Sequence, residues 1–133
     1  MQNAGLHVAA NLHDADGVAS WESQYNAFAT AVGINPSSQT TVAFNLVNET
    51  YAYGLEDIVL KAVEDMGMDF WWIDWQQGGQ MAGCTGDKQN PTIWTDHLRA
   101  TDHQRRGENV RGIVLARWGG LGTHRFVSSS LWR

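Results

Sequence analysis

The hydrophobic residues of this chain fall into short apolar runs and longer stretches with a helical repeat. The runs at 6–12, 70–73 and 110–116 have the length and residue types of buried strands. From Val42 to Leu46, large apolar residues alternate with smaller or polar ones, which predicts a further short, half-buried strand.

Three stretches between these runs have the spacing of an amphipathic helix. The first spans about 20–33, with Ser20 as its N-cap and Gly33 just after its last turn. The second runs from about 50 to 66, and the third begins at Asn90-Pro91 and frays before residue 107. Their apolar positions are Trp21, Tyr25, Phe28 and Val32; Leu55, Ile58, Val59, Ala62, Val63 and Met66; and Ile93, Trp94, Leu98 and Thr101.

The alternation of strands and helices predicts an α/β fold. Helices that connect successive strands imply parallel pairing through right-handed crossovers. At 133 residues the chain has the length of one domain and can bury a real core. Because parallel strands end at the same edge of a sheet, we expect the residues that follow the three runs to share one rim.

Polar residues follow each of the three runs. The turn His13-Asp14-Ala15-Asp16 follows the first, Asp74 the second and Arg117 the third. Carboxylates and arginine hydrogen-bond hydroxyl groups, and aromatic faces pack against the apolar faces of sugar rings. Four of the seven tryptophans lie at or near the predicted strand ends, namely Trp71, Trp72, Trp75 and Trp118. The rim therefore predicts a site for a polyhydroxylated ligand, although Asp74 could also serve only to bond nearby backbone amides.

Other chemistries fit the same residues less well. The turn 13–16 contains one histidine and two closely spaced aspartates, but this spacing is not typical of a metal site. The glycines at 119–122 match no phosphate-binding pattern, and the serines at 128–130 lie outside any nucleophile elbow. Cys84 is the only cysteine, so no internal disulfide exists, and no His/Asn framework for a catalytic thiol is evident.

Composition and charge exclude several classes of partner. The net charge is −5 and there is no Lys/Arg run, which argues against a nucleic acid or an anionic membrane surface. No apolar run approaches the length of a transmembrane helix, and the first residues lack the features of a signal peptide. Localisation is not indicated. We expect Arg99, Arg105 and Arg106 to form a solvated helix end, with His97 and His103 solvated on the same helix.

Three segments resemble motifs of glycoside hydrolase family 31, and they occur in the family's order. The resemblance covers about residues 5–126 and is nearest to the branch with Trp-Gln-Gln after the key aspartate, where better-known members have Met-Asn-Glu. The segments are Asn11-Leu12-His13-Asp14-Ala15-Asp16-Gly17 with Glu22 and Tyr25; Asp69-Phe70-Trp71-Trp72-Ile73-Asp74-Trp75-Gln76-Gln77-Gly78; and Arg117-Trp118-Gly119-Gly120-Leu121-Gly122-Thr123-His124-Arg125-Phe126.

The resemblance implies a retaining α-glycosidase that hydrolyses α-linked carbohydrate substrates on a (β/α)8 TIM barrel, without a cofactor or a metal. Asp74 would be the nucleophile that forms a covalent glycosyl intermediate, and Arg117 would hydrogen-bond the sugar in the first subsite. The remaining substrate-binding residues would shape the pocket wall. They are His13, Asp14, Asp16, Trp72, Trp75 and Trp118.

The chain departs from the family in two respects. A complete barrel takes roughly 200–250 residues, so this sequence accounts for only three or four of its eight strands. Retention also needs a second carboxyl about 5 Å from the nucleophile, and the family's position for that aspartate is occupied here by Arg133. We therefore expect residues 1–133 to be a single incomplete catalytic-barrel fragment, with little or no turnover alone.

Two alternatives follow from the same pattern. The chain could be a non-catalytic α/β protein that binds carbohydrate or associates with itself through open sheet edges. It could also be a small doubly wound sheet with an unrelated role.

Overall fold

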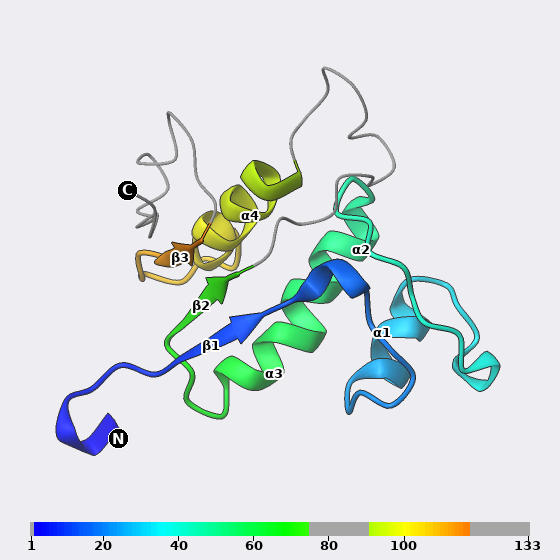
Figure 1. The fold of residues 1–133 in the computed structure, drawn as a ribbon, viewed down its shortest axis with the longest axis horizontal. Helices are drawn as coiled ribbons and strands as arrows, with labels where there is room; N and C mark the ends of the chain where they lie inside the picture. The colour runs from blue at the N-terminus through cyan, green and yellow to red at the C-terminus, as the bar shows by residue number, and fades with distance from the viewer. Residues whose placement is uncertain (1, 75–90, 118–133) are drawn as a thin grey trace.

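In the described part of the chain, three parallel strands form a single sheet. The computed structural model describes residues 2–74 and 91–117. The strands are β1 (Ala9–Leu12), β2 (Phe70–Ile73) and β3 (Val114–Ala116), and β2 lies between the other two (Figure 1). Leu12, Ile73 and Ala116 stand opposite one another, so the three strands end at a common edge. The mixed α/β fold with parallel strands is as predicted.

The three predicted helices are confirmed, with shifted ends. The first is α1 (Tyr25–Ala31), which begins later than the pattern indicated and leaves Trp21 84% exposed. The second is a continuous helical stretch made of α2 (Glu49–Gly54), the π-helical η4 (Leu55–Leu60) and α3 (Lys61–Glu64). The third is α4 (Pro91–Arg105). Three single-turn 3-10 segments complete the order, η1 (Gln2–Ala4), η2 (Asp14–Asp16) and η3 (Pro36–Ser38).

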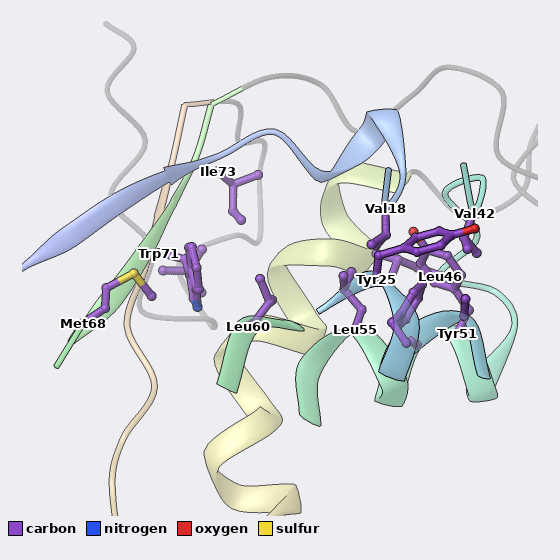
Figure 2. Close-up of a cluster of buried hydrophobic side chains, with 14 of the residues drawn as sticks. Val18, Tyr25, Val42, Leu46, Tyr51, Leu55, Leu60, Met68, Trp71 and Ile73 are labelled. Atoms are coloured by element: carbon purple, nitrogen blue, oxygen red, sulfur yellow. The ribbon is translucent and has the colours of Figure 1, made fainter. Parts of the chain in front are cut away.

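The hydrophobic core lies between one face of the sheet and the helices. Trp71 and Ile73 are buried and point from β2 toward the helical stretch that carries Leu55 and Leu60 (Figure 2). Phe28 is fully buried and meets Tyr51 edge-on, with the ring centroids 5.1 Å apart. Apolar burial therefore stabilises both the contact between the sheet and the helices and the contact between α1 and α2.

The opposite face of the sheet is more open. Burial alternates along β2, where Phe70 and Trp72 are only half-buried, and along β1, where Ala9 and Asn11 are exposed. Such alternation is the mark of a sheet covered on one side. Within the described residues, the helical layer therefore covers a single face.

The strand predicted from Val42 to Leu46 is wrong. Only an isolated antiparallel bridge forms, between Val18 and Val42. The backbone N–H of each residue donates to the carbonyl oxygen of the other at 2.9 Å. Val42 and Leu46 are 4% and 1% exposed, because both side chains anchor this loop into the core. The alternation of apolar residues therefore results from the burial of these side chains. No partner strand among the described residues extends the bridge into a ladder.

The predicted apolar stripe of α4 is confirmed only in part, since Trp94 and Leu98 are partly buried and pack against the core. Ile93 is 37% exposed, and the helix instead buries a polar face. Arg99 is 5% exposed, which contradicts the expectation of a solvated helix end. His97 is half-buried and stacks on Trp94 with the ring centroids 5.2 Å apart, while the Nδ1 of His103 lies 2.5 Å from Glu108. The buried polar residues of this face are Thr92, Thr95, Asp96, Arg99 and Asp102.

Gly17 fixes the turn between β1 and α1, and its replacement by alanine should destabilise the fold. Its φ is +78°, and a Cβ there would lie 2.1 Å from the Val42 carbonyl oxygen. Gly33→Ala is the matched control, because Gly33 has φ +79° but open space around its Cβ position. We expect Gly17→Ala to lower the free energy of unfolding by about 1–3 kcal/mol more than Gly33→Ala. Urea titration measures both, and equal losses would contradict the close approach.

Candidate functional site

Asp74 follows β2 directly, at the edge where the three strands end. Its side chain is 13% exposed, and both carboxylate oxygens are held from the neighbouring strands. Asn11 on β1 donates from Nδ2 to Oδ2 at 2.9 Å, and Arg117 after β3 donates to Oδ1 at 3.0 Å. The Nε2 of His13 lies 3.4 Å from Oδ2. The carboxylate is therefore fixed from both sides.

The sheet itself sets this arrangement. The backbone N–H of Arg117 donates to the Ile73 carbonyl at 2.8 Å, which continues the β2–β3 pairing beyond Ala116. The parallel register opposes Asn11 to Trp72, two residues before Asp74. Since side chains alternate along a strand, Asn11 and Trp72 share the open face of the sheet. The Asp74 carboxylate accordingly sits where that open face meets the strand ends.

The surroundings of Asp74 favour its charged form. The hydrogen bond from Asn11 lowers the pKa of Asp74 most, burial opposes it, and the bonds from Arg117 and His13 lower it further. An anionic carboxylate bonded by several donors is the expected outcome of such contacts. At neutral pH the site presents a carboxylate that can act as a nucleophile or accept hydrogen bonds.

Three of the predicted site residues are thus brought together, Asp74, Arg117 and His13. Trp72 lies on the open face next to Asn11, and its indole Nε1 is buried without a hydrogen-bond partner among the described residues. Trp75 and Trp118 lie outside the described residues. So do Cys84, the glycines at 119–122 and the serines at 128–130.

Asp14 and Asp16 do not contact Asp74. Asp14 is 6% exposed, and its Oδ2 accepts a hydrogen bond from Arg99 of α4 at 2.7 Å. Asp16 is exposed at the end of η2. The turn therefore offers His13 to the site, while its first aspartate points into the protein.

The sequence interpretation assigned no role to Asn11. The signal that could have found it is the period of two along β1, since Asn11 and His13 are two residues apart and Asn11 opposes Trp72. Because side chains alternate between the two faces of a strand, residues two positions apart lie on the same face. Arg99 was missed for a different reason, because a charged helix residue is normally exposed.

No group of three or more histidine, cysteine, aspartate or glutamate side chains in residues 2–74 and 91–117 is arranged to hold a metal ion. Within the same ranges, no helix is both long and apolar enough to cross a membrane. A comparison with models of known protein families finds no match, and a comparison with curated proteins finds none either.

Proposed function

We propose that this chain carries the nucleophile side of a retaining α-glycosidase site, on part of a (β/α)8 barrel of the glycoside hydrolase family 31 type. The observation that carries the proposal is the ionised Asp74 at a strand end, with both oxygens held by Asn11, His13 and Arg117. The three sequence motifs quoted above support it. The first motif supplies Asn11 and His13, the second supplies Asp74, and the third begins with Arg117.

The topology agrees with a barrel segment. In residues 2–74 and 91–117, consecutive strands stand in the order β1-β2-β3, and helices cover one face of the sheet but not the other. A doubly wound sheet reverses its strand order and carries helices on both faces. In a barrel the open face becomes the interior, and active sites lie at the carboxyl ends of the strands. Asp74, His13 and Arg117 occupy that position.

In the proposed reaction, an oxygen of Asp74 attacks the anomeric carbon while the bond to the leaving oxygen breaks. Arg117 has several N–H donors and would hydrogen-bond a sugar hydroxyl as it does the carboxylate. Protonation of the leaving oxygen requires a second carboxyl about 5 Å away. By the family resemblance, the position of that carboxyl is occupied here by Arg133. We therefore propose that the chain alone forms the intermediate only when the leaving group needs no proton.

Fluoride leaves without protonation, which gives a direct test. Incubation with a panel of 5-fluoro-α-glycosyl fluorides should transfer one glycosyl group to the chain, as the Asp74 carboxylate displaces fluoride from the anomeric carbon. Intact-mass spectrometry measures the added mass, and peptide mapping places it on Asp74. Hydrolysis of unactivated alkyl α-glycosides should be absent, since the missing acid is worth roughly 10²–10⁴ in rate.

Asp74→Asn should abolish the labelling, whereas Asp65→Asn should label as the wild type does, because Asp65 is an exposed carboxylate after α3 that pairs with Lys61. Labelling that persists in Asp74→Asn, or none with any sugar in the panel, would refute the proposed nucleophile.

A non-catalytic, self-associating protein is the second candidate. Within the described residues β1 and β3 each pair on one side only, and nearby apolar side chains are exposed, with Leu6 at 59%, Val110 at 60% and Ile113 at 53%. Open edges favour pairing with another chain. Light scattering should then show a mass that rises with protein concentration, and a constant monomer mass would rule out this candidate.

A further inference from the structure

A buried ion pair joins helix α4 to the turn that carries His13. Arg99 donates from its terminal nitrogen to Oδ2 of Asp14 at 2.7 Å, although the two residues are 85 positions apart in the chain. Their side chains are only 2% and 3% exposed. Arg99 also forms an ion pair with Glu56 of η4, whose side chain is 2% exposed. Three separate elements therefore meet at one guanidinium.

The placement of these charges is costly. Burial raises the pKa of Asp14 and lowers the pKa of Arg99, and the attraction between the two groups opposes both changes. Replacing a buried ion pair by apolar residues is often neutral or stabilising, so stability alone does not explain it. The best-attested use of buried charged groups is to select one arrangement of the elements that carry them.

The element selected here is the η2 turn. No side chain caps it, and its backbone closes through the N–H of Gly17, which donates to the Asp14 carbonyl at 2.9 Å. His13 immediately precedes Asp14, and its side chain is 47% exposed. Because the imidazole is attached to the turn, the backbone position of the turn limits where the ring can lie. That position depends on the anchor at Asp14.

We infer that Arg99 is a positioning residue, which acts through Asp14 to hold the His13 ring against the Asp74 carboxylate. Helix α4 thereby completes the donor set of Asp74 without touching it. As a statement about catalysis this inference rests on the proposed function. Its geometric content can be measured on the resting protein.

The test reads the carboxyl of Asp74 by carbon-13 NMR as a function of pH. Among the described residues, the groups that hydrogen-bond this carboxyl are Asn11, His13 and Arg117. Since the bond from His13 lowers the pKa of Asp74, His13→Ala should raise it. Asp14→Asn should raise it by the same amount, and the double variant should show no further rise. This non-additivity is the signature of two residues acting through one contact.

Arg99→Lys provides a second route to the same answer. Lysine keeps the charge but loses the planar fork that reaches Asp14 and Glu56 together. It should reproduce the rise in the Asp74 pKa, so the test stands even if Asp14→Asn does not fold. Asp16→Asn is the matched control and should leave the Asp74 pKa unchanged. Amide spectra of each variant verify that the fold is retained.

The inference would be overturned if Asp14→Asn and Arg99→Lys fold but leave the Asp74 pKa at its wild-type value. It would also be overturned if their effects add to that of His13→Ala. Failure of the proposed function looks different, because there the NMR shifts occur as expected and no glycosyl fluoride labels Asp74.

Discussion

Arg99→Met is expected to lower the free energy of unfolding by about 3–5 kcal/mol, which is a large fraction of the stability of a small domain. Methionine is close to the length of the arginine stem, so the apolar packing is largely kept. The loss comes from Asp14 and Glu56, which are 6% and 1% exposed and would become buried carboxylates without a cation. A buried charge without a partner costs far more than a lost surface contact.

Arg105→Met is the matched control on the same helix. Arg105 forms ion pairs with Asp57 and Asp102, but its side chain is 30% exposed. Solvent screens such pairs, so we expect a loss of about 1 kcal/mol or less. Urea titration followed by tryptophan fluorescence compares the two variants. Equal losses would contradict a special role for the buried guanidinium.

The penalty should disappear when the orphaned carboxylates are also removed. A variant that combines Arg99→Met with Asp14→Asn and Glu56→Gln has no unpaired buried charge, so we expect it to regain most of the lost stability. Lowering the pH should act in the same direction on Arg99→Met, because protonation neutralises both carboxyls. A triple variant as unstable as Arg99→Met would show that the loss arises from packing.

The sequence predicted the sheet well because its strands follow simple rules. The run at 70–73 is confirmed as β2, whereas the runs at 6–12 and 110–116 form strands only over their last residues, 9–12 and 114–116. Short apolar runs bounded by turns or helices are sufficient to identify strands in an α/β chain. Parallel pairing of these strands predicts that His13, Asp74 and Arg117 lie at one edge, and the structure brings the three residues together there. The error at Val42 to Leu46 arose because burial alone produces the same alternation as strand pairing.

The buried face of helix α4 was predicted incorrectly from the sequence because that face is polar. Asp96, Arg99 and Asp102 recur every three residues, so their common face was visible in the sequence. Because these residues are polar, the sequence predicted that the face is exposed to solvent. In the structure, Arg99 instead forms buried ion pairs with Asp14 and Glu56. Such long-range pairing has no local signature. The role of Asp14 was hidden for the same reason.

The second large effect concerns Asp96, whose ionisation should make the protein less stable as the pH rises. Asp96 is fully buried, and neither of its carboxylate oxygens has a hydrogen-bond partner in the described residues. Burial raises its pKa from 3.8 to about 7. Between these values the folded chain keeps a proton that the unfolded chain has released. Stability falls with pH wherever the folded state binds more protons.

Asp96→Asn isolates this contribution, because the amide cannot ionise but has nearly the same shape. One pKa unit corresponds to about 1.4 kcal/mol, so the stability of the wild type relative to Asp96→Asn should fall by about 3 kcal/mol from pH 4 to pH 7. Above pH 7 the difference should level off, since Asp96 is then ionised in both states. Chemical denaturation at a series of pH values measures it. Asp16→Asn, which alters an exposed carboxyl, should follow the wild-type curve. A difference between Asp96→Asn and wild type that stays constant with pH would mean that Asp96 is ionised and solvated in the folded chain.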